Sequence, residues 1–333
     1  MTASAPRVLV LGRSDVAALL GLSECIAAVE EAFRREAEGR TLPAGVLSIP
    51  ATGGGFHVKA AGVRGERSFF AAKVNANFAG NRERYGLPTI QGVIVFCDAE
   101  RGSPLAVLDS AEITVLRTAA ATGVAARHLA RADSTVATVC GCGRQGRAQL
   151  AALAEVLPLK RAYAFDADPA AAARYGTEMS AALGFPVEAA GDLAAAARRS
   201  DVVVTCTPSR SPLLLPDDVR PGTFVAAVGA DSPDKQELHP GLLARSRVVV
   251  DVLAQCAEMG DLHHALAAGV LARGDVHAEL AEVVAGRKPG RVAPDETFVF
   301  DSTGTALEDV AAAAAVYEKA VARGRGLSVD LAG

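Results

Sequence analysis

The octapeptide VCGCGRQG at residues 139–146 constrains the fold more than any other part of the chain, because it joins a run of β-branched residues to an amphipathic helix pattern. In such a strand–turn–helix context Gly141 can make the tight turn, Gly143 can let the backbone approach a pyrophosphate, and Gly146 can let the helix pack on the strand. The pyrophosphate would lie on the amides at the helix N-terminus. The stretch therefore predicts a dinucleotide-binding turn.

A second residue supports this interpretation. Asp166 ends the next predicted strand, AYAFD, 25 residues after Gly141, where the usual spacing is ~20. A carboxylate there accepts hydrogen bonds from the ribose hydroxyls and repels a 2′-phosphate. The pair predicts NAD as the cofactor in preference to NADP.

Cys140 and Cys142 lie within the same octapeptide, one residue apart, with no second Cys or His pair near them in sequence. Structural zinc sites usually use pairs at Cys-x-x-Cys spacing. We therefore interpret both as small residues that fill the turn, and we predict no metal site. The six cysteines are spread along a chain without a recognisable signal peptide, which predicts a reduced, cytoplasmic protein.

The remaining chain shows two patterns of predicted secondary structure. Strands alternate with helices from residue 120 to 305, which predicts an α/β domain of Rossmann type with a doubly wound parallel sheet that binds NAD. Before it, we expect a helix capped by Ser14, broken near Gly21 and ended by Gly39, then short antiparallel strands and a helix from about Thr118. We assign residues 1–119, with 306–333 returning, to a mixed α+β domain for substrate binding and dimerisation.

Composition excludes other function classes. The 333 residues carry a formal net charge of −4, and Lys and Arg are scattered rather than clustered. We therefore expect neither a nucleic acid nor a membrane surface as a partner. No apolar stretch reaches the ~20 residues that a membrane-spanning helix needs.

Several longer segments carry a family resemblance. KVNANFAGN, GLPTIQG, SPLAVLDSAEITVLRTAAATGVAARHLA, AVGADSPDKQELHP and FVFDSTGTALEDV occur in this order. Together they resemble the ornithine cyclodeaminase/μ-crystallin family, which includes ornithine and lysine cyclodeaminases, an archaeal alanine dehydrogenase, ketimine reductases and ectoine-utilisation proteins. The resemblance implies hydride exchange between a nicotinamide cofactor and the Cα of an amino or imino acid.

The resemblance also assigns the reacting residues. Lys73 in AAKVN matches the substrate lysine, which can also polarise a carbonyl or orient water; on residue pattern alone it could face solvent. Arg117 matches the arginine that grips the substrate carboxylate, and its apolar surroundings require a buried partner. Asp231, after the predicted strand FVAAVGA, matches the acid beside the reacting carbon and nitrogen; otherwise it could cap a turn.

The cofactor-lining residues follow in the same way. The resemblance implies contacts from Thr89, Thr118, Lys235 and Ser302. The glycine turn itself adds Arg144 and Gln145, and we also assign Thr207 to the cofactor.

One position departs from the family pattern. Cyclodeaminase-like members carry Arg or Lys shortly after a proline, where this chain has Ala44 and Gly45. Lys59 could supply the missing cation, as in the ectoine-utilisation branch. Alternation places His57 on the same strand face as Lys59, so the two form a candidate pair for substrate binding; an exposed polar face is the alternative.

These residues predict an NAD-dependent oxidoreductase acting on a small L-amino acid or its imine, either alanine dehydrogenase-like or cyclodeaminase-like. TCTPSR and DVHAELAEVVAGRKPGR resemble the alanine dehydrogenase branch, and GDLHHALAAG resembles the ectoine-utilisation branch. A ketimine reductase and a non-catalytic, μ-crystallin-like cofactor-binding protein are the alternatives. The first domain's strand edges and the family both predict a homodimer.

Overall fold

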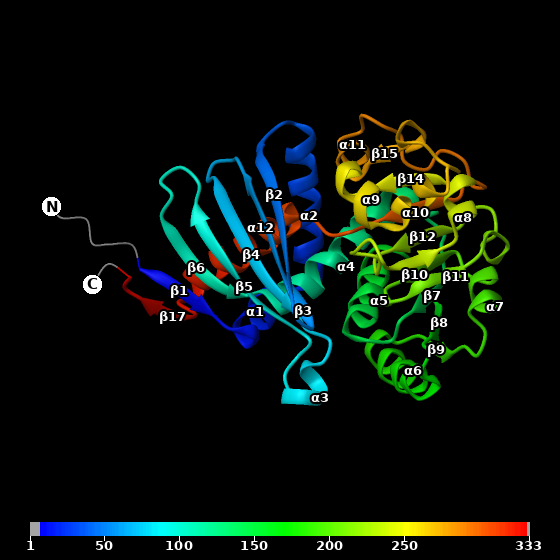
Figure 1. Ribbon diagram of the computed structural model, residues 1–333, viewed down its shortest axis with the longest axis horizontal. Helices are drawn as coiled ribbons and strands as arrows, with labels where there is room; N and C mark the ends of the chain where they lie inside the picture. Colours follow the sequence, from blue (N-terminus) through cyan, green and yellow to red (C-terminus); the bar gives the residue numbers. More distant parts are fainter. Residues whose placement is uncertain (1–6, 332–333) are drawn as a thin grey trace. The chain divides into compact units, whose positions relative to one another are not determined.

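The computed structural model describes residues 7–331 and contains two compact units (Figure 1). The first unit runs to Arg117 and resumes at Thr305, and the second runs from Thr118 to Gly304. Residues 1–6, the start of the segment in which we expect no signal peptide, lie outside the described residues.

The first unit is built on a seven-stranded sheet with the order β17-β1-β6-β5-β4-β3-β2. Its strands are β1 (Val8–Leu11), β2 (Thr41–Ala51), β3 (Gly54–Val63), β4 (Phe69–Asn77), β5 (Ile90–Asp98), β6 (Pro104–Asp109) and β17 (Leu327–Val329). Strands β2 to β6 are antiparallel neighbours, which confirms the prediction for this region. Strand β1 was not expected from the sequence; it pairs parallel with β6.

One face of this sheet is covered by helices. The first unit contains α1 (Arg13–Leu19), α2 (Leu22–Ala37), α3 (Asn81–Tyr85), the start of α4 (Ser110–Leu129) and α12 (Ala306–Arg323). Helix α12, near the C-terminus, packs against α2, β3 and β4 (Figure 1). It brings side chains from the end of the sequence onto the strand that carries Lys73.

Two predicted helix starts in this unit were wrong. Gly12, not Ser14, is the residue before α1, because the Asp15 carboxylate accepts a hydrogen bond from the Gly12 amide at 3.1 Å and closes the first turn. Helix α4 begins at Ser110 rather than near Thr118, because the Asp109 carboxylate accepts a hydrogen bond from the Glu112 amide at 2.9 Å. Both are local caps made by an acidic side chain. The predicted end of α2 is correct, since Gly39 follows it with a φ of 73°.

The second unit is a parallel sheet with the order β15-β14-β16-β12-β10-β7-β8-β9, as predicted for a doubly wound fold. Its strands are β7 (Val136–Cys140), β8 (Arg161–Phe165), β9 (Val187–Ala189), β10 (Val202–Thr205), β12 (Phe224–Ala227), β14 (Arg247–Val250), β15 (Ala278–Glu279) and β16 (Phe298–Asp301). Two further strands of this unit, β11 (Arg210–Leu214) and β13 (Gln236–Leu238), form a separate two-stranded sheet.

The helices of the second unit follow its strands. After the second part of α4, they are α5 (Arg144–Val156), α6 (Pro169–Leu183), α7 (Leu193–Arg198), α8 (Pro240–Ala244), α9 (Leu253–Met259), α10 (Asp261–Ala267) and α11 (Leu280–Val284). Every residue of β10, β12 and β16 is buried, as expected for strands covered on both faces. The chain reverses its winding direction between β7 and β10, where doubly wound sheets bind ligands at the strands' carboxyl ends.

Candidate functional site

The glycine turn of the second unit has the geometry that a dinucleotide requires. Gly141 has a φ of 105°, and a Cβ added to it would lie 2.9 Å from the Cys206 carbonyl oxygen. A Cβ on Gly146 would lie 2.0 Å from the Gly141 carbonyl oxygen, so neither position accepts a side chain. At Gly143, the residue before α5, a Cβ would meet nothing within 4 Å, so its backbone is open to a ligand. Arg144 and Gln145 follow in the first turn of α5.

A cavity of about 500 Å³ opens beside this turn, and its lining includes Gly141, Gly143, Asp166 and Thr207. Asp166 is fixed there because its carboxylate oxygens accept hydrogen bonds from the amides of Cys142, at 2.8 Å, and Asp168, at 3.0 Å. The cavity thus combines an open turn, a helix N-terminus and an anchored carboxylate at the switch point of the sheet. These features fit NAD.

The cysteines of the turn are buried thiols. Burial raises the pKa of Cys142 to about 12 and raises the pKa of Cys140 as well, with nearby carboxylates adding to the effect. Both therefore remain protonated near neutral pH. Within residues 7–331, no group of His, Cys, Asp and Glu is arranged to hold a metal ion.

In the first unit, Lys73 is the centre of a buried charge cluster. The side chain is only 5% exposed, and its Nζ lies 2.7 Å from Asp309 Oδ2 and 3.4 Å from Thr114 Oγ1. The alternative of a solvent-facing lysine is therefore wrong. The cluster is defined here as Lys73, Arg117, Glu308 and Asp309.

Arg117 is buried as expected, but the chain itself supplies partners for it. Its Nη1 lies 2.8 Å from Glu308 Oε2, and its Nε lies 3.1 Å from Asp309 Oδ1. A substrate carboxylate is one partner that can satisfy this buried cation, and the two carboxylates at the start of α12 already meet part of that need. Glu308 also closes the first turn of α12 with Thr305 as a capping box.

Burial and charge act together on the cluster. Burial lowers the pKa of Lys73 to about 8, although the Asp309 carboxylate works in the opposite direction. Burial tends to raise the pKa of Asp309, but the positive charges of Lys73 and Arg117 outweigh it and hold that pKa below its usual value. Asp309 is therefore ionised, and it holds two cations in place.

Glu308 and Asp309 were not among the site residues expected from the sequence. Their signal was present: two adjacent carboxylates in the otherwise apolar stretch TALEDVAAAAA. Buried carboxylates require cationic partners. Arg117 lies in an apolar stretch of its own and in the same way requires an anionic partner.

Lys59 lies directly across from Lys73, because the two are register partners on β3 and β4. His57 lies on the same face, with its Nδ1 3.1 Å from Ser48 Oγ. The register also pairs Lys59 with Val46, next to Gly45, so Lys59 lies beside the position where the family pattern has its additional cation. Thr89 precedes β5 and is partly buried, and Thr118 lies on α4, also partly buried.

Asp231 lies in a loop after β12, four residues beyond the strand's end at Ala227, so the predicted strand was too long. Its carboxylate forms an ion pair with Lys235 of the same loop and is 52% exposed. The structure thus brings Asp231 together with Lys235, as it brings Lys73 and Arg117 together on Asp309. Ser302 is buried after β16 and donates a hydrogen bond to Asp251 at 3.0 Å.

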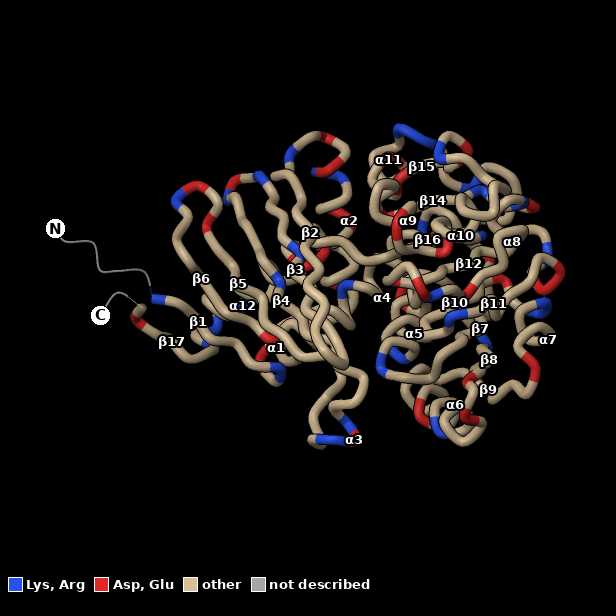
Figure 2. Tube along the Cα trace, in the orientation of Figure 1, with Lys and Arg blue, Asp and Glu red and all other residues tan. Residues whose placement is uncertain are grey.

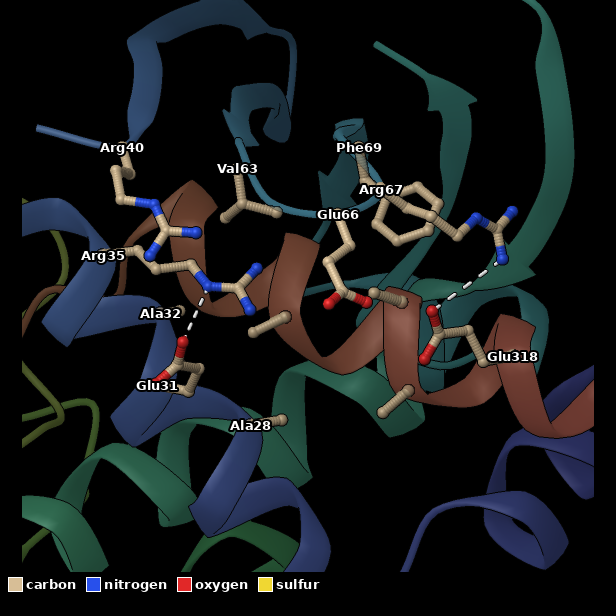
Figure 3. A pocket seen from close by; sticks show the side chains of 13 residues that line it. Ala28, Glu31, Ala32, Arg35, Arg40, Val63, Glu66, Arg67, Phe69 and Glu318 are labelled. Carbon is tan, nitrogen blue, oxygen red and sulfur yellow. Dashed lines mark hydrogen bonds and ion pairs between the residues drawn. The ribbon is translucent and has the colours of Figure 1, made fainter. Parts of the chain in front are cut away.

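Another cavity, of about 480 Å³, lies in the first unit between α2, α12 and the β3–β4 turn (Figure 3). Its arginines have carboxylate partners: Arg35 lies 2.8 Å from Glu31, and Arg67 lies 3.9 Å from Glu318. None of the predicted site residues lines it. Elsewhere on the chain, Lys and Arg are interspersed with Asp and Glu (Figure 2). Among the described helices, none is long and apolar enough to cross a membrane.

Comparison with known proteins places these features in a family. The sequence profile of the ornithine cyclodeaminase/mu-crystallin family matches residues 7–324. The chain is 38% identical to an alanine dehydrogenase of Archaeoglobus fulgidus over 96% of this chain and 98% of that one.

Solved structures agree with the sequence comparison. An archaeal alanine dehydrogenase dimer with bound NAD superposes with a TM-score of 0.93 at 37% identity, covering 98% of this chain and 99% of that one. A Δ1-pyrroline-2-carboxylate reductase of Thermococcus litoralis, in complex with NADH and L-proline, gives a TM-score of 0.92 at 34% identity, covering 97% and 100%. The chain therefore belongs to the ornithine cyclodeaminase/mu-crystallin family, and it is an NAD-dependent oxidoreductase.

Proposed function

We propose that the protein exchanges hydride between NAD and the Cα of a small L-amino acid. Hydride transfer to NAD, with loss of a proton from the amine, gives the 2-imino acid, which water hydrolyses to the 2-oxo acid and ammonia. The observation that carries the proposal is the buried charge cluster, because it holds Lys73 and Arg117 rigidly on one carboxylate, Asp309. The identity to the archaeal alanine dehydrogenase supports an oxidation of this kind. The lack of a cation at Ala44 and Gly45 argues against ornithine.

In this proposal the cations of the first unit hold the substrate carboxylate. Arg117 presents a planar guanidinium to it, and Lys73 supplies a point charge from the facing strand. Lys59 adds a further positive charge opposite Lys73. Such a clamp fixes the orientation of Cα–H before the reaction.

Asp231 would move the proton. The α-amine must be neutral before hydride leaves Cα, and a carboxylate with more than half of its surface exposed can accept that proton. A positioned base typically contributes ~10²–10⁴-fold to the rate. NAD, when bound, accepts the hydride in oxidation and its reduced form returns it in the reverse direction.

The test is a screen of L-amino acids with NAD and with NADP, in which both NADH absorbance and free ammonia are measured. NADH together with ammonia supports the proposed dehydrogenase. Ammonia without NADH would contradict it and indicate a cyclodeaminase. No change with any substrate, in either direction, would indicate a non-catalytic cofactor-binding protein.

A reductase of cyclic imines is the second candidate, because the Thermococcus litoralis reductase that this chain resembles is in complex with NADH and L-proline. The same cationic clamp would hold the carboxylate of a ring imine. This candidate requires NADH consumption with a cyclic imino acid and no added ammonia. A rate with cyclic imines above that with any 2-oxo acid plus ammonia would favour it over the dehydrogenase.

We also propose a homodimer, through the sheet face of the first unit that lies opposite Lys73. The register aligns Leu47, Val58, Val74 and Val93 in one row across β2 to β5. Leu47 is 55% exposed and Val93 is 44% exposed, although both are apolar. An apolar face of this kind is typical of a surface that a second copy covers.

Light scattering tests the dimer. The wild-type chain should scatter as a dimer at micromolar concentration, and Val74→Lys should shift it toward monomer by placing a charge in the row. A monomeric wild type would overturn this proposal. The cytoplasmic location is likewise our proposal, supported by six free cysteines; recovery of the protein from a secreted fraction would contradict it.

A further inference from the structure

Glu237, on β13, is a buried carboxylate that no role described above uses. It is 0% exposed. Its Oε1 accepts hydrogen bonds from the Thr207 amide at 2.6 Å and from the Thr207 hydroxyl at 2.7 Å. Its Oε2 accepts one from the Gly229 amide at 2.8 Å. One side chain thus binds the loop after β10 and the loop after β12.

Both loops carry residues to which we assign a role in cofactor binding or proton transfer. Thr207 lines the cavity beside the glycine turn, and its methyl carbon would lie 3.1 Å from a Cβ on Gly141. Gly229 precedes Asp231 by two residues. A Cβ on Gly229 would lie 2.3 Å from the Thr207 carbonyl oxygen and 2.6 Å from the Glu237 carboxyl group. The two loops therefore pack directly on each other and on Glu237.

Glu237 is itself held from behind by buried acids. Asp261 accepts hydrogen bonds from the amides of Glu237 and Leu238, at 2.9 and 2.8 Å. Asp301 in turn accepts hydrogen bonds from the amides of Asp261, at 3.2 Å, and Leu262, at 2.8 Å. This connected set links the end of β16 to the cavity wall through three carboxylates, each of which accepts hydrogen bonds from backbone amides.

We propose that Glu237 is a positioning residue, which fixes Thr207 on the wall of the NAD cavity and fixes the start of the Asp231 loop. Its three partners are all donors, so only the ionised carboxylate satisfies them all. A neutral amide of the same shape would point its own N–H₂ at one of these donors. Without this hydrogen bond Thr207 and the Asp231 loop are less ordered, and NADH binding has to restore that order. The affinity should then fall by about tenfold, the equilibrium factor for one hydrogen bond to a charged group.

The surroundings of Glu237 add a pH dependence to this role. Burial, with the negative charge of Asp261, raises the pKa of Glu237 to about 7. The thiols of Cys140 and Cys206 also face it, and burial keeps their pKa values above the usual range, so they remain neutral. Burial raises the pKa of Asp261 to about 6, so Asp261 adds to the pH dependence of NADH affinity only below the pH at which Glu237 titrates. NADH affinity should therefore fall as the pH is lowered through 7.

Direct NADH titration by fluorescence tests the proposal without any substrate, so its failure is distinguishable from a failure of the proposed reaction. Glu237→Gln should weaken NADH binding by about tenfold and remove the part of the pH dependence near 7. Glu155→Gln, the same change at an exposed position on α5, serves as the matched control and should bind as wild type does. A Glu237→Gln protein with unchanged affinity and pH profile would overturn the proposal.

Thr207 provides the second arm. Thr207→Val removes the hydroxyl that donates to Glu237 and should weaken NADH binding, whereas Thr207→Ser keeps the hydroxyl and should restore it. If Glu237 acts through Thr207, the double variant Glu237→Gln/Thr207→Val should bind NADH no more weakly than Glu237→Gln alone. Fully additive losses would contradict that route. If Glu237→Gln does not fold, the pH profile of Thr207→Val decides the question, because the lost hydroxyl hydrogen bond is one that lowers the pKa of Glu237. The fall in NADH affinity should then begin at a higher pH than in the wild type, and an unshifted profile would overturn the proposal.

Discussion

The Lys73 ammonium and the Asp309 carboxylate form a buried ion pair, with Nζ 2.7 Å from Oδ2 and with less than 6% of either side chain exposed. Arg117 shares the same carboxylate through its Nε, at 3.1 Å from Oδ1. Asp309 therefore pairs with two buried cations, of which Arg117 has Glu308 as a second partner. The free energy of the site is sensitive to Asp309, because removing one partner leaves uncompensated charge in a low-dielectric interior.

Replacing Asp309 tests this dependence. Asp309→Asn should lower the free energy of unfolding by roughly 3–5 kcal/mol, the usual cost of breaking a buried ion pair. Urea unfolding followed by circular dichroism measures the change. Glu318→Gln, a similar neutralisation on the exposed side of the same helix, should have little effect because its pairing with Arg67 is mostly exposed. Equal stability of the Asp309 variant and wild type would contradict our account of the cluster.

The pKa of Lys73 predicts how substrate binding varies with pH. Because the folded-state pKa is about 8, against 10.5 ordinarily, the lysine loses its charge in the folded protein first. The KM for the amino acid should therefore rise as the pH increases through 8, as the positive charge facing the substrate carboxylate is lost. Lys73→Arg, which stays charged, should flatten this rise. A KM that falls over the same range would show that neutral Lys73 is the active form.

The same shift has a consequence for stability, with a definite sign. Between pH 8 and 10.5 the unfolded chain binds more protons at Lys73 than the folded chain does. The contribution of Lys73 therefore makes the folded state relatively more stable as pH rises across this window. Comparison of wild type with Lys73→Met over that range isolates the contribution.

Arg117→Lys tests the role of the guanidinium. The variant retains a positive charge near Glu308 and Asp309, so most of the stability should remain, but it cannot bind a carboxylate through two parallel hydrogen bonds. We expect the KM for the amino acid to rise by about tenfold or more, with NADH affinity unchanged. Wild-type kinetics would show that Arg117 has only a structural role with α12.

Asp166 determines the cofactor preference in our interpretation. Its carboxylate is anchored by the amides of Cys142 and Asp168 and lines the cavity. NAD should bind about tenfold more tightly than NADP, since the 2′-phosphate of NADP would have to approach this carboxylate. Asp166→Ser should narrow the gap, and titration with both cofactors measures it. Equal affinities of the wild type for NAD and NADP would contradict the role assigned to Asp166.

Asp231→Asn separates binding from proton transfer. The amide keeps the size of the carboxylate but cannot accept a proton near neutral pH, so kcat should fall by roughly 10²-fold or more while NADH binding persists. Asp234→Asn, three residues further along the same loop, is the matched control, because Asp234 pairs with Arg210 outside the proposed chemistry. A kcat near wild type in the Asp231 variant would place the base elsewhere.

Sequence alone was sufficient for features with a local physical cause. The glycine turn at Gly141 to Gly146 was recognisable because steric exclusion and a positive φ are properties of a few adjacent residues. The alternation of strands and helices in the second unit was recognisable because the hydrophobic period is local. Even so, the starts of α1 and α4 were misplaced. Asp15 closes the first turn of α1 in place of the expected Ser14 cap, and Asp109 caps α4 well before Thr118.

The partners of the site residues were decided only by the tertiary structure. Arg117 is 191 residues from Glu308 in the chain, and Lys73 is 236 residues from Asp309. No local pattern connects such positions. Lys73 meets Asp309 because α12 packs on β4, and Arg117 of α4 reaches the first turn of the same helix. The same holds for Glu237, which is 30 residues from Thr207 and reaches it through the pairing of β11 with β13. The sequence alone determined which residue types could carry the chemistry, whereas chain packing determined which charges neutralise one another, because electrostatic energy depends on distance in space and on burial.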